Sequence, residues 1–141
     1  MRSSAASSAR ERWRRIAEGL RHSKKRDAEA IHHHYDVSNA FYEWVLGPSM
    51  TYTCACYPDT EATLEEAQEN KYRLVFEKLR LSPGDRLLDV GCGWGSMVRH
   101  AARRGVHVLG VTLSREQASW AQQAIDAEGL GEFAQVRHSD Y

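Results

Sequence analysis

The sequence lacks any apolar run long enough to cross a bilayer, and residues 1–30 contain no apolar stretch of the kind found in a secretory signal peptide. Cysteine is scarce. An odd set of three (Cys54, Cys56 and Cys92), without a secretion signal, indicates free thiols rather than a disulfide framework. These features predict a cytoplasmic protein. With 141 residues and 42% apolar content, the chain is sufficient for one modest domain with its own core.

The sequence also lacks net charge, but its charges are unevenly distributed. Residues 1–30 carry nine Lys and Arg against four Asp and Glu, so this basic, flexible segment predicts an anionic partner surface. The remainder has no basic stripe, which argues against nucleic acid. Trp13, Ile16, Ala17 and Leu20 have helical spacing. We therefore expect an amphipathic helix that either lies peripherally on the inner membrane surface or packs on the domain.

Two helices are predicted before residue 82. The first covers residues 37–45, with Asp36 or Ser38 as its N-cap and Gly47-Pro48 as its stop. The second begins at a capping box of Thr63 and Glu66 and runs to about residue 79. We interpret residues 31–82 as a helical lid that forms the roof of an active site.

Strands and helices alternate in the rest of the chain. The pattern predicts a strand over 86–90, a helix over 94–105, a strand over 106–111, a helix over 114–129 and a strand over 133–141. This β-α-β-α-β order predicts the α/β class, as the first half of a doubly wound parallel sheet. Residues 83–141 would then form the first half of a Rossmann-like cofactor-binding domain.

Two familiar nucleotide-binding patterns are missing from the turn after the first strand. Gly91, Gly93 and Gly95 give G-x-G-x-G, whereas a dinucleotide site has G-x-G-x-x-G and a P-loop has Gly-Lys-Ser/Thr. Glycines at this turn still let the backbone approach a ligand, and ligands of doubly wound sheets bind there.

An acidic residue is also missing where a dinucleotide site would need one. The second strand ends at Val111-Thr112, with no carboxylate for ribose hydroxyls, and Asp89 instead precedes the glycine turn. A carboxylate there suits a ligand with an ammonium and a sulfonium, which favours S-adenosylmethionine over NAD. A nicotinamide oxidoreductase with an unusual loop and a purely structural turn are the alternatives.

Longer motifs resemble the family of cyclopropane-fatty-acid synthases and mycolic acid cyclopropane synthases. They are HYDVSNAFYEWVLGPSMTYTCACY, TLEEAQENKYRLVFEKLRLSPGDRLLDVGCGWG, GVTLSREQ and SDY, which together cover most of residues 33–141. The resemblance implies a Rossmann-like class I methyltransferase. Such an enzyme transfers the methyl of S-adenosylmethionine to the cis double bond of an unsaturated acyl chain, here in a phospholipid. The resulting carbocation loses a proton to bound bicarbonate and closes to a cyclopropane, while relatives leave a methyl branch or a methylene group.

The resemblance also implies which residues act. Two are expected at the reacting centre, Cys54 as a bicarbonate contact and Tyr35 as a nearby aromatic residue. The expected cofactor contacts are Tyr52, Thr53, Asp89, Gly91, Gly93, Gly95, Thr112, Gln117 and Asp140.

Several of these residues allow simpler interpretations. Tyr42 and Trp44 fall in a helical apolar pattern, so we expect them in the core rather than at the site. Gln117 has capping-box spacing from Ser114 and could serve only as that partner. We expect no metal, because a lone C-x-C lacks further ligands and the adjacent His32–His34 would point in different directions on a helix.

The sequence stops after the third predicted strand, whereas the family continues for about as much again. A three-stranded sheet with an uncovered edge is prone to aggregation. We therefore expect an amino-terminal fragment of a lipid methyltransferase that is inactive alone. A non-catalytic S-adenosylmethionine-binding module is the alternative.

Overall fold

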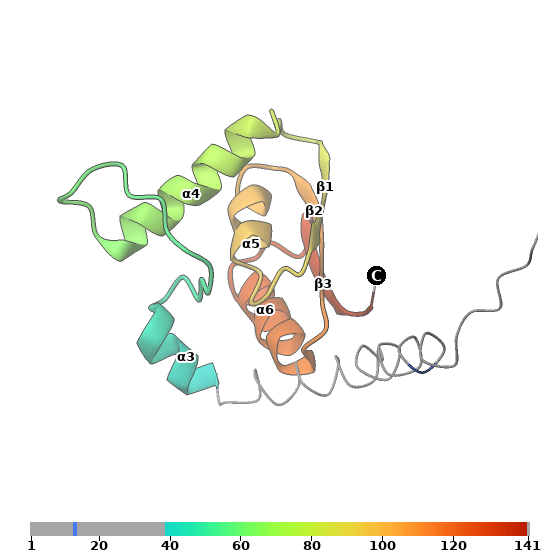
Figure 1. Cartoon of the computed structure of the whole chain (residues 1–141). Coiled ribbons are helices and arrows are strands. Elements are labelled where there is room, and N and C mark those ends of the chain that lie inside the picture. Colours follow the sequence, from blue (N-terminus) through green and yellow to red (C-terminus); the bar gives the residue numbers. More distant parts are fainter. Residues whose placement is uncertain (1–12, 14–38, 141) are drawn as a thin grey trace, which may run out of the picture.

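The computed structural model describes Trp13 and residues 39–140 (Figure 1). Two helices come first, α3 (Asn39–Leu46) and α4 (Leu64–Lys78). The chain then alternates through β1 (Arg86–Val90), α5 (Ser96–Ala102), β2 (His107–Thr112), α6 (Arg115–Ala127) and β3 (Ala134–His138). This order confirms the predicted β-α-β-α-β unit. The predicted amphipathic helix, apart from Trp13, and the predictions for His32–His34 and Tyr35 lie outside the described residues.

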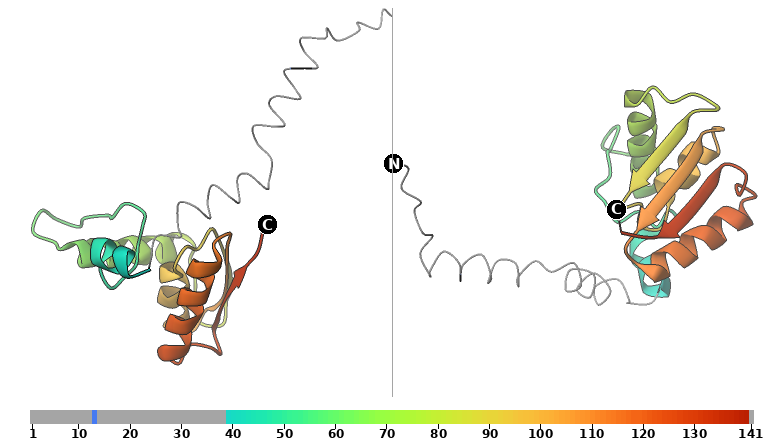
Figure 2. Two further views of the ribbon diagram at one scale, coloured as in Figure 1. Left: turned by 90° about the horizontal axis from the view of Figure 1, so that it is seen from below. Right: turned by 90° about the vertical axis from the view of Figure 1, so that its right-hand side faces the viewer.

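The three strands form a parallel sheet in the order β1-β2-β3. Helices α5 and α6 cover one face of this sheet, as the turned views show (Figure 2). Val98, Ala121 and Ile125 from these helices pack on Val108 and Val136 of the sheet to form the main core. The opposite face of β1 leaves apolar side chains exposed.

Gly110 sets how closely α5 approaches the sheet. A Cβ at this position of β2 would lie 2.9 Å from Cys92 Sγ, 2.9 Å from Val98 Cγ2 and 3.1 Å from Val136 Cγ2. Only hydrogen fits there, so the glycine turn and α5 can lie directly over the middle strand.

Local signals set the ends of the helices. At the start of α4, the Glu66 N–H donates to Thr63 Oγ1 at 3.2 Å and the Thr63 N–H donates to Glu66 Oε2 at 2.8 Å, which confirms the capping box. Helix α3 ends at Leu46, before Gly47 with its positive φ of 68°. Helix α5 is shorter than predicted, because Gly95 adopts a left-handed φ of 72° just before it and Arg103 caps its end.

The orientation of α3 corrects one prediction. Tyr42 is buried, as expected, with its ring centroid 4.6 Å from that of Trp94. Trp44 is 91% exposed, so the prediction that it joins the core is wrong. Tyr42 and Trp44 are two positions apart, so on a helix their side chains point in different directions. The contacts of Tyr42 and its neighbours determine that the Tyr42 side of α3 faces the domain.

Candidate functional site

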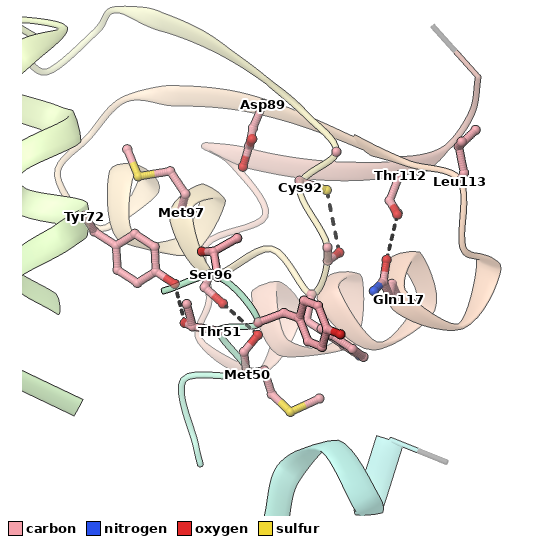
Figure 3. A pocket seen from close by; sticks show the side chains of 15 residues that line it. Met50, Thr51, Tyr72, Asp89, Cys92, Ser96, Met97, Thr112, Leu113 and Gln117 are labelled. Carbon is pink, nitrogen blue, oxygen red and sulfur yellow. Dashed lines mark hydrogen bonds between the residues drawn. The ribbon is translucent and has the colours of Figure 1, made fainter. Parts of the chain in front are cut away.

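A cavity of about 430 Å³ lies where the β1–α5 loop and the end of β2 meet residues 50–53 (Figure 3). This is the carboxyl edge of the sheet, where ligands of doubly wound folds bind. The cavity brings together seven of the predicted cofactor contacts, namely Tyr52, Thr53, Asp89, Gly91, Gly93, Thr112 and Gln117.

The glycine loop forms an open cradle in the cavity wall. Gly91 and Gly93 have positive φ values of 77° and 56°, and a Cβ on either would meet no atom within 4 Å. The N–H groups of Gly91 and Cys92 donate to Val111 O at 2.9 and 3.0 Å, which fastens the loop to β2. Backbone conformation therefore requires glycine here, and the open space lets a ligand approach.

Asp89 places a carboxylate at the base of this cradle. It lies partly buried on β1, and no described residue donates a hydrogen bond to it. Burial alone raises the pKa of Asp89. A desolvated carboxylate without a partner among the described residues favours a cationic ligand. Burial, together with the Asp89 charge, also raises the pKa of the Cys92 thiol to about 12, so this thiol stays protonated.

Thr112 and Gln117 form a buried polar pair across the cavity from the roof (Figure 3). Thr112 Oγ1 donates to Gln117 Oε1 at 2.8 Å, and the Ser114 N–H donates to Thr112 Oγ1 at 3.3 Å. The Gln117 N–H donates to Ser114 Oγ at 3.2 Å, so half of the predicted capping box is present. The Gln117 side chain turns to Thr112 at the cavity, so capping is not its only contact.

The roof of the cavity is tied to α4. Thr53 O accepts from Gln68 Nε2 at 3.0 Å, and Thr53 Oγ1 accepts from Lys71 Nζ at 2.6 Å. Partial burial lowers the pKa of Lys71, while the nearby thiols of Cys54 and Cys56 oppose this shift. The sequence analysis predicts no role for Lys71. Its i, i+3 spacing from Gln68 on the predicted helix was the signal available.

The structure adds lining residues that sequence reasoning missed. The Tyr72 and Thr51 hydroxyls are hydrogen-bonded to each other (Figure 3). Ser96 Oγ donates to Ser49 O at 2.6 Å. These bonds join α4, α5 and the roof segment around the cavity. No local motif signals them, because the partners meet only in the folded chain. The missed lining residues are Met50, Thr51, Tyr72, Cys92, Trp94, Ser96, Met97 and Leu113.

Three predicted site residues among those described do not line the cavity. Gly95 lies against α6, where its Cβ would be 3.1 Å from Ala121 Cβ, so its absent side chain serves helix packing. Cys54 is exposed beside the roof, and Asp140 is exposed beyond β3. Tyr35 lies outside the described residues.

The described residues lack two further features. None of their His, Cys, Asp and Glu side chains form a group of three or more that could hold a metal ion. No helix among them combines the length and the apolar character needed to cross a membrane.

The sequence profile of the mycolic acid cyclopropane synthetase family matches residues 22–141. A probable fatty acid methyltransferase of Mycobacterium tuberculosis is 78% identical over 133 residues, which are 94% of this chain and 31% of the relative. Cyclopropane mycolic acid synthase 2 of Mycobacterium bovis is 53% identical over 94 residues, 66% of this chain and 31% of the relative. Sphingolipid C9-methyltransferase A of Emericella nidulans is 44% identical and is matched over 83% of this chain and 23% of its own length.

Solved structures agree with these matches. The cyclopropane synthase MmaA2 of Mycobacterium tuberculosis has a TM-score of 0.75 and 42% identity, over 79% of this chain and 40% of that one. Mycolic acid cyclopropane synthase CmaA1, complexed with SAH and CTAB, has a TM-score of 0.73 and 40% identity over the same shares. The chain thus spans a third or less of these curated relatives. It has part of the Rossmann-like class I methyltransferase fold. It belongs to the mycolic acid cyclopropane synthetase family.

Proposed function

We propose that the cavity at the carboxyl edge of the sheet binds S-adenosylmethionine. The observation that carries this proposal is the Asp89 carboxylate, which lies in the cavity wall without a described hydrogen-bond donor. A ligand with an ammonium and a sulfonium would compensate its charge. Gly91 and Gly93 leave room beneath the methionine part, and Tyr52 and Thr53 approach it from the roof.

The nucleoside part would lie toward the polar pair of the cavity. Thr112 and Gln117 offer a hydroxyl and an amide for ribose and adenine contacts. Their bond to each other fixes both side chains before a ligand arrives, which reduces the entropy lost on binding. Asp140 and Gly95 enter this proposal only through the family resemblance, since neither lines the cavity.

The reaction would be methyl transfer to the cis double bond of an unsaturated phospholipid acyl chain. The bound cofactor would supply an electrophilic methyl group. An alkene has no proton to remove before attack, so the site needs no strong base at that step. Tyr52 and Trp94 present aromatic rings that would stabilise the lipid carbocation. The proton would pass to bicarbonate, for which Cys54 is the family-implied contact in this chain, and Tyr35 would face the reacting centre.

The relatives support an acyl-lipid substrate in general. They are named as fatty acid, mycolic acid and sphingolipid enzymes. A methyl-branched or methylene product is the second candidate to the cyclopropane, because the name fatty acid methyltransferase at 78% identity specifies methyl transfer and no product. A non-catalytic S-adenosylmethionine-binding module is the remaining alternative. We propose that this methyl transfer takes place at the cytoplasmic side of the inner membrane.

The test uses methyl-labelled S-adenosylmethionine with vesicles of monounsaturated phospholipid and, as a control, vesicles of saturated phospholipid. Label in the monounsaturated acyl chains alone supports methyl transfer at the double bond, and NMR of the product separates ring, methylene and branch. Cofactor binding without transfer supports the non-catalytic module instead. Absence of both would overturn the proposal.

A further inference from the structure

Helix α3 is held to the domain along one side. Asn39 Oδ1 accepts from Trp94 Nε1 at 3.0 Å, and Glu43 Oε1 accepts from Trp120 Nε1 at 3.0 Å. Between them, Tyr42 is buried against Trp94. These contacts reach both the glycine loop and α6, so they fix which side of α3 faces outward.

The outward side carries a stripe of large apolar side chains. Phe41, Trp44 and Val45 are 50%, 91% and 57% exposed, and their i, i+3 and i+4 spacing puts them on one side of the helix. A tryptophan this exposed is unusual for a folded domain, whereas tryptophan is enriched at the interface between membrane and water.

This stripe, residues 41, 44 and 45, lies beside the candidate site. The Tyr42 ring on the same helix lies 6.3 Å from the Tyr52 ring and 4.6 Å from the Trp94 ring, measured between centroids. Both Tyr52 and Trp94 line the cavity. Figure 1 shows α3 next to the glycine loop, away from the end of α4 that leads into β1. A lipid surface on the stripe would therefore hold acyl chains close to the cofactor.

Charge along the sequence indicates which surface this would be. Residues 1–30 precede α3 and carry nine Lys and Arg against four Asp and Glu. Such a segment is attracted to anionic lipid headgroups, while an aromatic stripe inserts at the headgroup level. Glu43, the acidic residue of α3, is engaged by Trp120 on the inward side.

We propose that Phe41, Trp44 and Val45 form a docking surface for an anionic lipid bilayer, from which an acyl chain reaches the neighbouring cavity. The delivery of an acyl chain rests on the proposed function, whereas the docking itself can be measured without cofactor or turnover.

The experiment is co-sedimentation of the protein with vesicles of phosphatidylcholine and phosphatidylglycerol. Trp44→Ser removes the most exposed member of the stripe, and Leu79→Ser is the matched control because Leu79 is 53% exposed at the far end of α4. We expect Trp44→Ser to weaken vesicle binding about tenfold, as loss of one buried tryptophan side chain implies. Leu79→Ser should bind like the unchanged protein. Both variants should keep the same thermal midpoint, since both positions are exposed.

A second readout places the stripe in the lipid. Phospholipids brominated on their acyl chains should quench the tryptophan fluorescence of the protein, and Trp44→Ser should lose most of that quenching. Equal vesicle binding by the protein and Trp44→Ser would overturn the proposal. So would a dimer in solution that Trp44→Ser dissociates, because the stripe would then be an interface between two copies. Vesicle docking that depends on Trp44, in a protein that binds no S-adenosylmethionine, would retain the docking surface and reject the proposed function.

Discussion

At the scale of single residues, the charge of Asp89 lowers the stability of the fold but would favour the binding of a cationic ligand. Its carboxylate is partly buried on β1, and burial raises its pKa. The folded chain therefore disfavours the charged form of Asp89. Stability from this group is fully present below its unfolded pKa of about 3.9 and is lost as the pH rises through the raised folded pKa. A cationic ligand would reverse that loss.

Asp89→Asn should separate the two effects. Without cofactor, we expect a higher thermal midpoint than the unchanged protein at pH 7 and a smaller difference at pH 3, because the amide cannot ionise. Affinity for S-adenosylmethionine should fall about tenfold, the cost of one charge interaction. Thermal melts across this pH range and calorimetric titration measure the two quantities. A lower midpoint at pH 7 with unchanged cofactor affinity would show that Asp89 serves only the fold.

At the scale of elements, helices α4 and α5 meet around a buried histidine. His100 on α5 is fully buried, with Nδ1 3.0 Å from Glu69 Oε1 on α4 and the Tyr72 and Phe76 rings nearby. Burial lowers the pKa of His100, and the positive charge of Arg104 lowers it further, while Glu69 raises it. The net shift is downward, so the ring is neutral in the folded chain at pH 7. Arg103 acts in the same direction as Arg104.

The packing of α4 on α5 should therefore weaken in acid. A lowered histidine pKa gives stability that is present above the unfolded value of about 6.5 and is lost as the pH falls toward the folded pKa. The thermal midpoint should drop between pH 7 and pH 5, and His100→Gln, whose side chain does not titrate, should show a smaller drop. If the thermal midpoint falls equally in both proteins between pH 7 and pH 5, His100 does not titrate in this range.

Gly110 in β2 gives a prediction for the contact between α5 and the sheet. Gly110→Ala would bring a Cβ to 2.9 Å from both Cys92 Sγ and Val98 Cγ2, so we expect a loss of about 1–3 kcal/mol in the free energy of unfolding, as for overpacked cores. Gly131→Ala is the control, because its nearest neighbour would be Asp126 Oδ1 at 3.9 Å. Urea denaturation measures both. A Gly110→Ala protein as stable as the control would contradict the close packing described here.

The elements were largely predictable because their signals are local. Hydrophobic periodicity gave the strands, and Thr63 and Ser114 gave the starts of α4 and α6. Which side of α3 packs on the domain was not predictable. Apolar residues lie on both of its sides, and the choice depends on Trp94 and Trp120, which are 55 and 77 residues away from their α3 partners.

At the scale of the whole molecule, the cavity depends on contacts between distant segments. The lining residues come from the roof (50–53), α4 (72), β1 and the glycine loop (89 and 91–94), α5 (96 and 97), β2 and the turn after it (112 and 113) and α6 (117). Motif resemblance predicted the members that belong to recognisable patterns, such as Thr112 and Gln117. It missed Tyr72, whose place depends only on how α4 packs on the domain.

The arrangement of the sheet allows cofactor binding to be tested on this chain alone. Helices cover one face, and Leu88 and Val90 of β1 are exposed on the other. The cavity lies at the carboxyl edge among elements that the described residues themselves supply (Figure 3). Cofactor recognition can therefore be tested on this chain, although it spans only about a third of the curated relative with 78% identity.

The most direct test of the central claim is calorimetric titration of the chain with S-adenosylmethionine and, in parallel, with NADH. We predict saturable binding of S-adenosylmethionine at one site, and none of NADH, because the G-x-G-x-G turn is preceded by Asp89 and the second strand ends without an acid. Tight binding of NADH without binding of S-adenosylmethionine would contradict the account.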